Sequence, residues 1–148
     1  QTAMMLGDRW GGALVAAAFQ GLHRFGEFES ALGVSPYVLT ERLDALVTIG
    51  VFERRPYQSA PLRHAYHFTA KGLELFPMTL ELLRWGDRWL ADARGAPLRV
   101  IHDPCGHAVG PQLRCSHCGE VLARRGLRLE GGTGSGSSEK ATPMDAKL

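Results

Sequence analysis

The chain has 148 residues, a formal net charge of +2, 45% hydrophobic residues and 22% charged residues. These values are ordinary for a soluble protein with one core and a small appendage, and the charge alone does not predict nucleic-acid binding. No apolar run approaches the roughly 20 residues that span a bilayer, and nothing resembles a signal peptide. We therefore expect a cytoplasmic protein with no membrane partner. Because the chain begins at Gln1 inside a helical pattern, we expect the natural N-terminus to lie upstream.

The N-terminal third predicts two helices. The first covers residues 2–20, and because three glycines weaken its start, the regular helix is expected from about Trp10 onward. Residues 21–24 form the turn that leads to a short second helix over residues 25–32. The side chains expected on the inner faces of these helices are Leu6, Trp10, Leu14, Ala17, Ala18, Phe25, Phe28 and Leu32.

Residues 35–50 predict a third helix with a defined start and end. Ser35 can cap the first turn, Pro36 suits the first helical position, and Gly50 can end the helix in a left-handed conformation. An apolar stripe at helical spacing comprises Leu39, Leu43, Leu46 and Val47. We expect this helix, residues 36–49, to follow the second one after a tight turn.

A basic hairpin and a long helix follow. Residues 51–55 and 63–69 predict two strands, and residues 56–61 predict the turn between them. Thr69 can cap a helix over residues 70–93, which we expect to be kinked or to start late near Pro77. Because this helix is longer and more apolar than the domain needs, we expect a homodimer that associates through helix 70–93 and the N-terminal helix. A terminal core helix of a monomer is the alternative.

The sequence thus predicts a mainly α fold with a small β wing, in three regions. A winged helix-turn-helix domain occupies residues 1–94, and a zinc-ribbon-like β unit with strands at 98–101, 112–114 and 120–123 occupies residues 98–130. Residues 131–148 form a Gly- and Ser-rich tail that we expect to be disordered, since it carries too few apolar residues to fold.

Several motifs in residues 5–90 resemble those of the HxlR-type, MarR-like winged-helix transcription regulators. They are LGDRW at residues 6–10, RFGEF at 24–28, LTERL at 39–43, GVFERRPY at 50–57, YHFTAKGL at 66–73 and WGDRW at 85–89. The resemblance implies a bacterial regulator that binds double-stranded operator DNA as a homodimer. Some members of the family sense oxidants through a cysteine near the N-terminus. No cysteine precedes Cys105 in this chain, so sensing of that type has no support here.

Helix 36–49 is the expected recognition helix in the major groove, and the basic wing 51–69 is expected on the flanking backbone or minor groove. In the wing, arginines and a histidine stand against the single acid Glu53. The residues predicted to contact DNA are Arg24, Ser35, Tyr37, Thr40, Arg42, Arg54, Arg55, Arg63 and His64. For each of them, a capping or solvated role is the alternative.

Two short motifs in the C-terminal region carry potential metal ligands three residues apart, each followed by glycine. The pairs are His102 with Cys105, and Cys115 with Cys118. This spacing predicts a structural Zn²⁺ bound by one histidine and three cysteines, with His107 as an alternative fourth ligand and His117 as a weaker one. Four protein ligands leave no open position for catalysis.

We expect no enzymatic activity, because the sequence contains no nucleophile–base pair, phosphate loop or paired acids. Two alternatives to the regulator are a winged-helix and zinc-ribbon module for protein interaction and a zinc-thiolate redox sensor. The space near the aromatic residues of the first and last helices leaves a small-molecule effector open as a further partner.

Overall fold

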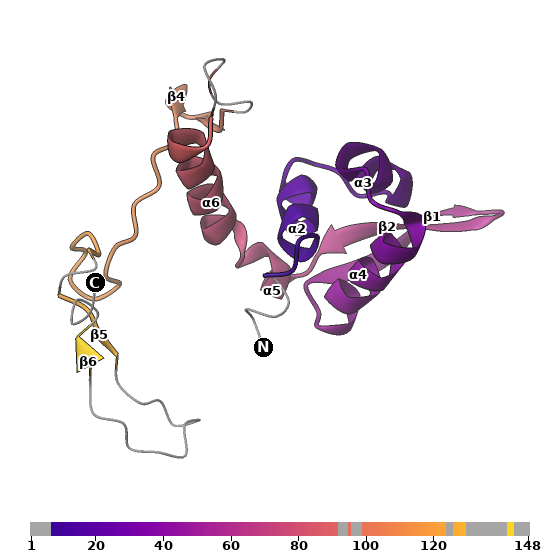
Figure 1. Ribbon diagram of the computed structural model, residues 1–148, viewed down its shortest axis with the longest axis horizontal. Coiled ribbons are helices and arrows are strands. Elements are labelled where there is room, and N and C mark those ends of the chain that lie inside the picture. Colours follow the sequence, from indigo (N-terminus) through magenta and orange to yellow (C-terminus); the bar gives the residue numbers. More distant parts are fainter. Residues whose placement is uncertain (1–6, 92–94, 96–98, 124–125, 130–141, 144–148) are drawn as a thin grey trace. The chain divides into compact units, whose positions relative to one another are not determined.

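The computed structural model describes residues 7–91, 95, 99–123, 126–129 and 142–143, and the chain divides into two compact units, residues 1–98 and 99–148 (Figure 1). The first unit contains α2 (Gly11–Phe19), α3 (Phe25–Leu32), α4 (Pro36–Thr48), β1 (Phe52–Ser59), β2 (Leu62–Phe68), α5 (Ala70–Leu73) and α6 (Phe76–Trp89). The second unit contains β3 (Ile101–His102), β4 (His107–Ala108), β5 (Arg128–Leu129) and β6 (Thr142–Pro143). The mainly α fold with a small β hairpin is as predicted.

One hydrophobic core lies between α2, α3, α4 and the start of the hairpin. The largest fully buried side chains are Phe28, Phe52, Leu14, Leu39, Leu43, Leu46, Val15 and Val51. Of the predicted inner residues, Ala17 is also buried, and Trp10, Ala18, Phe25 and Leu32 pack partly buried against this core. Leu6 lies outside the described residues. The predicted apolar stripe of α4 is thus the side that faces the core.

The first helix starts where Asp8 caps it. The Asp8 carboxylate accepts hydrogen bonds from the backbone N–H groups of Trp10 (2.6 Å) and Gly11 (2.9 Å), which have no carbonyl partner within the helix. The late start expected near Trp10 is confirmed, and the part of the prediction on residues 1–6 lies outside the described residues.

The next two helices begin with capping interactions. Before α3, the Glu27 carboxylate accepts from the backbone N–H groups of His23 and Arg24, each at 2.9 Å. The helix ends at Gly33 in a left-handed conformation. Ser35 then accepts from the Val38 N–H at 3.5 Å, a long hydrogen bond at the start of α4. Helix, tight turn and helix follow one another as predicted.

The hairpin is longer than the sequence suggested. The predicted turn over residues 56–61 is too long, because β1 continues to Ser59 and β2 starts at Leu62. Pro56 pairs with His64 and Gln58 with Arg63, with a bulge in between. Both strands of a two-stranded ribbon are edge strands, so a proline without an N–H is tolerated there. The result is a long wing that extends away from the core (Figure 1).

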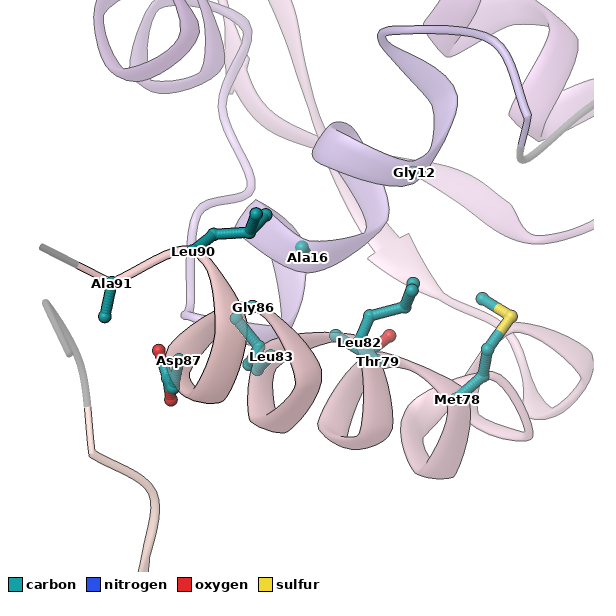
Figure 2. A pocket seen from close by; sticks show the side chains of 10 residues that line it. All are labelled: Gly12, Ala16, Met78, Thr79, Leu82, Leu83, Gly86, Asp87, Leu90 and Ala91. Carbon is teal, nitrogen blue, oxygen red and sulfur yellow. The ribbon is translucent and has the colours of Figure 1, made fainter.

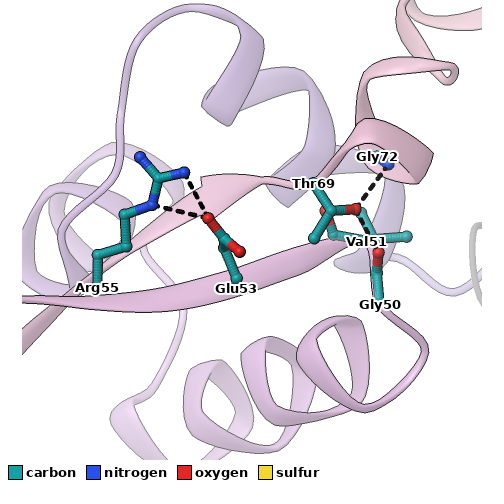
Figure 3. A network of polar contacts seen from close by, with 6 residues as sticks. All are labelled: Gly50, Val51, Glu53, Arg55, Thr69 and Gly72. Carbon is teal, nitrogen blue, oxygen red and sulfur yellow. Dashed lines mark hydrogen bonds and ion pairs between the residues drawn. The ribbon is translucent and has the colours of Figure 1, made fainter.

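A polar junction fixes the base of the wing (Figure 3). The Thr69 hydroxyl donates to the Gly50 carbonyl (2.5 Å) and accepts from the Gly72 N–H (3.1 Å). A Cβ atom at Gly72 would lie only 2.2 Å from the Val51 carbonyl oxygen. Strand and helix therefore approach as closely as they do because residue 72 has no side chain.

The predicted helix over residues 70–93 is instead two helices. It breaks between Leu73 and Phe76, and α6 then starts with Pro77 in its first turn, because proline cannot donate to a preceding carbonyl. The late start at Pro77 is confirmed, whereas the continuous helix from residue 70 was wrong. Residues 92 and 93 lie outside the described residues. No described helix is long and apolar enough to cross a membrane.

A shallow apolar groove of about 340 Å³ runs between α2 and α6. In Figure 2, Leu82 and Leu90 extend from α6 and its C-terminal end toward α2, where Gly12 and Ala16 leave room. Large apolar side chains are also exposed along the rest of α6, including Trp85 (53% exposed). The last helix of the first unit therefore leaves much of its apolar side uncovered.

The second unit consists of short antiparallel pairings. The strands predicted at 98–101, 112–114 and 120–123 were too long, and the structure has the β3–β4 pair and a single bridge between Arg114 and Val121. Residues 99–123 and 126–128 of this unit include no buried residue. Most of the predicted tail lies outside the described residues. Within it, Thr142–Pro143 pairs with β5.

Candidate nucleic-acid interface

The side of α4 opposite the core faces solvent along its whole length. Leu39, Leu43 and Leu46 are buried, and residues at the complementary helical spacing are exposed. The exposed residues of this stripe are Tyr37, Thr40, Glu41, Asp44, Ala45 and Thr48. No arginine or lysine belongs to it. This face is therefore suited to contacts with base edges more than with phosphates.

The N-terminal half of this stripe presents a mixed polar and apolar surface. Tyr37 is 75% exposed. The Thr40 hydroxyl donates to the Pro36 carbonyl at 2.8 Å, so an oxygen lone pair and the methyl group are left for other contacts. Ser35 is exposed but serves as the helix cap. Of these three predicted contact residues, Tyr37 and Thr40 are the ones whose chemistry is open to a ligand.

Arg42 lies beside this stripe, on the flank of α4 that faces the first helix. Its Nε is 2.7 Å from Asp8 Oδ2, and its side chain is 39% exposed. Burial raises the pKa of Asp8, but the N–H groups of Gly11 and Trp10 and the charge of Arg42 outweigh it and hold that pKa below its ordinary value. Arg42 thus has a structural partner that its spacing in the sequence did not reveal.

Arg54 connects the wing with α4. Its guanidinium pairs with the Asp44 carboxylate and lies 5.8 Å from the centre of the Tyr66 ring. The hydrogen bond with Tyr66, and then the charge of Asp44, raise the pKa of Arg54. The pairing neutralises an acid that would repel a phosphate, and it connects the base of the wing with the exposed stripe of α4.

The other basic residues predicted to contact DNA, in the wing and beside it, differ in their partners. Arg55 donates to Glu53 at 2.7 Å, and Arg24 lies 4.6 Å from the centre of the Tyr57 ring. His64 is half-buried, whereas Arg63 is exposed near the tip with no ion pair among the described residues. Arg63 is therefore the wing arginine most available to a phosphate.

The structure brings the predicted DNA-contact residues onto two neighbouring elements, α4 and the wing, with Arg24 beside the wing at the start of α3. Sequence reasoning missed Ala45 as a possible base-edge contact, although it follows from the stripe that complements the leucines. Gln58 was expected in the turn 56–61, and the hairpin register instead places it in β1 opposite Arg63.

The predicted metal ligands lie in two tight turns of the second unit. His102 Nδ1 is 3.3 Å from Cys105 Sγ in the first turn. In the second, the N–H groups of Cys118 and His117 and the Cys118 thiol bond to Cys115 and lower the pKa of its thiol. Among residues 99–123 and the other described parts, no three His, Cys, Asp or Glu side chains come together. The four-ligand site therefore stays a prediction.

Comparison with known proteins places the chain in a family. The HxlR-like helix-turn-helix family matches residues 5–94. A helix-turn-helix-type transcriptional regulator of Mycobacterium tuberculosis is 39% identical over 130 residues, covering 88% of this chain and 82% of that protein. Another such regulator, YvaP of Bacillus subtilis, is 37% identical over 87 residues, or 58% of this chain and 81% of YvaP.

Solved structures agree. The crystal structure of PA1607, described as a candidate transcription factor, superimposes with a TM-score of 0.72 at 34% identity, covering 82% of this chain and 84% of PA1607. The redox regulator HypR in its reduced form superimposes with a TM-score of 0.55 at 29% identity, covering 60% of this chain and 91% of HypR. With its exposed stripe on α4 and its basic wing, this chain belongs to the HxlR family of DNA-binding helix-turn-helix transcriptional regulators, which are not enzymes.

Proposed function

We propose that the chain is a homodimeric regulator that binds a pseudo-palindromic operator, with α4 in the major groove of each half-site and the wing on the flanking backbone or minor groove. One observation carries this proposal: the exposed stripe of α4 lies beside a hairpin whose arginines pair with one acid of each element. Asp44 is paired with Arg54 and Glu53 with Arg55. Base-edge chemistry and phosphate attraction are thus offered by adjacent elements.

The recognition face has groups that distinguish base pairs. Tyr37 and the Thr40 methyl group are suited to apolar contact with thymine methyl groups, and Ala45 adds a further small apolar surface. Glu41 can accept a hydrogen bond from the amino group of cytosine. Arg42 reaches a phosphate from the flank of the helix, with Asp8 fixing its direction. This assigns base contacts to the stripe and backbone contacts to its margin.

The tip of the wing supplies the second contact. Gln58 lies opposite Arg63 in the register, and both belong to strands that extend away from the core. An arginine on a narrow ribbon can enter the minor groove or bind its phosphates. Arg24 and Arg55, which pair with Glu27 and Glu53, place further guanidinium groups along the side of the wing.

A second copy of the chain is the occupant we assign to the uncovered side of α6. The residues Met78, Leu82, Trp85 and Trp89 recur at helical spacing and are each exposed, forming one stripe over three turns. A monomer rarely exposes a continuous apolar stripe of this length. The groove beside α2 is open along the same side of the helix, and two-fold pairing there would present two recognition helices to successive turns of DNA.

The test is selection of duplexes from a random DNA pool, followed by affinity measurement on the enriched site. Thr40 and Thr48 form a matched pair, because both are exposed on the same face and both donate to the carbonyl four residues earlier at 2.8 Å. Thr40→Ala should weaken operator binding about tenfold, and Thr48→Ala, at the far end of the helix, should leave it unchanged.

An enriched palindrome with this pattern of variants supports the regulator with α4 in the groove. If the two substitutions had equal effects on operator affinity, the proposed placement of α4 in the major groove would be wrong. Failure of the dimer to enrich any sequence would favour the protein-interaction module.

A further inference from the structure

We propose that the second unit is a metal-binding module in which a single Zn²⁺ is held by His102, Cys105, Cys115 and Cys118. The inference is independent of operator binding. It rests on the backbone and side-chain geometry of two turns and on the absence of buried side chains over residues 99–123 and 126–128.

The first turn is a preformed pair of ligands. The Cys105 and Gly106 N–H groups donate to the His102 carbonyl at 3.1 and 2.8 Å, and Gly106 has a φ of +68°. The pairing of β3 with β4 closes the hairpin around it. In a tetrahedral site, a nitrogen about 2.0 Å and a sulfur about 2.3 Å from zinc lie roughly 3.5 Å apart. The observed 3.3 Å between His102 Nδ1 and Cys105 Sγ is close to that separation.

The second turn repeats this construction with two cysteines. The Gly119 N–H donates to the Cys115 carbonyl at 2.8 Å, and Gly119 has a φ of +74°. The Cys115 N–H donates to Glu120, and the bridge of Arg114 with Val121 brackets the turn. Backbone N–H groups of residues 117 and 118 point at the Cys115 sulfur. Hydrogen bonds of this kind orient a thiolate ligand and share its charge.

His102 is favoured over His107 as the nitrogen ligand. The Nδ1 atom of His107 is 2.6 Å from the Cys105 carbonyl oxygen, whereas Nδ1 of His102 faces the Cys105 sulfur. His107 is thus tied to the backbone of the turn through Nδ1, which leaves only its Nε2 for a metal. Histidines that ligate metals through one ring nitrogen use the other in this way, so the substitution of His107 is the direct test between the two residues.

The unit has a physical need for a metal. Residues 99–123 and 126–128 are exposed or half-buried, and Ile101, Leu113, Val121 and Leu122 are all at least 40% exposed. A chain segment this small cannot be stabilised by apolar burial alone, and metal binding can supply the missing free energy. Residues 106–114 join the two turns and can span up to about 30 Å, so they allow the turns to meet at one ion.

Relatives share this part of the chain. The match to the Mycobacterium tuberculosis regulator covers 130 residues, whereas the family match ends at residue 94, so the similarity extends into the second unit. A solved structure of the candidate transcription factor PA1374 from Pseudomonas aeruginosa also superimposes over 90% of this chain, with a TM-score of 0.63 at 30% identity and 91% coverage of PA1374. The unit is therefore a shared part of these proteins and a reasonable place for a dedicated structural site.

The experiment is metal analysis of the full chain purified without chelator, combined with cobalt(II) absorption spectroscopy. We expect one zinc ion per chain, and a cobalt spectrum with intense d–d bands and sulfur charge-transfer bands typical of a tetrahedral thiolate site. Cys105→Ser and Cys115→Ser should each lower zinc affinity by at least tenfold. His102→Cys should retain binding, and His107→Ala and His117→Ala should behave as the wild type.

Circular dichroism of the helices shows whether each variant keeps the fold of the first unit. Fewer than one zinc per ten chains, wild-type zinc content in Cys115→Ser, or a Cys115–Cys118 disulfide in protein isolated without oxygen would overturn the proposal. None of these readouts depends on DNA, so they remain interpretable if the operator proposal fails.

Discussion

Asp8 joins the start of the first helix to the flank of α4. One of its carboxylate oxygens accepts from the N–H groups of Trp10 and Gly11, and the other lies 2.7 Å from Nε of Arg42. A single side chain therefore caps α2 and sets the direction of an arginine on α4. Substitutions of Asp8 can therefore distinguish the contribution of the helix cap from that of the ion pair.

Asp8→Asn keeps an oxygen for the cap but removes the charge, so it should lower the free energy of unfolding by less than about 1 kcal/mol. Asp8→Ala removes both interactions and should cost about 1–2 kcal/mol. Urea denaturation at neutral pH measures both. Equal losses in the two variants would show that the cap contributes nothing.

The stability of the first unit should fall in acid through the carboxylates that cap helices. Hydrogen bonds from His23 and Arg24 lower the pKa of Glu27 below its usual 4.5 in the folded chain. A lowered folded-state pKa gives stability that is present above the unfolded pKa and lost as the pH falls through the folded value. Glu27→Gln should therefore be less stable than the wild type at neutral pH, and the difference in their free energies of unfolding should become smaller below about pH 4. A difference that stays constant from neutral pH to about pH 3 would contradict a stabilising role of the ionised Glu27.

Glycine 72 has no room for a methyl group. Gly72→Ala should destabilise the first unit by about 1–3 kcal/mol or more, because the new Cβ would meet the Val51 carbonyl oxygen at 2.2 Å. Gly26 is the matched control, since it lies in α3 and a Cβ added there would have no other atom within 4 Å beyond its own neighbours and helix backbone. Gly26→Ala should raise the stability by about 0.5–1 kcal/mol. Thermal unfolding of both variants tests whether one loses and the other gains stability. If both variants were destabilised, the clash with Val51 would not explain the effect at Gly72.

Arg63 should contribute to the salt dependence of DNA binding. Arg63→Ala removes an exposed charge near the tip of the wing, and the slope of log affinity against log salt should become shallower by about 1. Arg84→Ala is the control, because Arg84 is paired with Glu81 on α6, away from the wing. A slope that changes with Arg84 and not with Arg63 would place the DNA on another surface.

The exposed side of α6 should control the oligomeric state. Leu82→Glu puts a charge into the apolar stripe and should convert the dimer to a monomer at micromolar concentration. Leu62 is a control of similar exposure, 63% against 59%, at the tip of the wing. Sedimentation velocity should find Leu62→Glu still dimeric. Dimers of Leu82→Glu would exclude this face as the interface.

The sequence by itself determined the elements that depend only on residues close together in the chain. The periodic leucines of α4, the proline in its first turn and the glycine after it specify a helix with two ends, and they do so within a few residues. The two turns that carry the predicted ligands His102 and Cys105, and Cys115 and Cys118, are likewise local, because a turn of this type needs only its own residues and one glycine.

Only the tertiary structure decided the interactions between distant segments. Arg42 looked free for DNA until the fold placed Asp8 beside it, and Arg54 was one basic residue among several until the hairpin brought it to Asp44. The length of the wing depended on pairing between its two strands. The close approach at Gly72 depended on the packing of α5 against Val51, the residue that precedes β1. Side-chain spacing along the chain specifies a face, but which group meets that face is set by packing between elements far apart in the sequence.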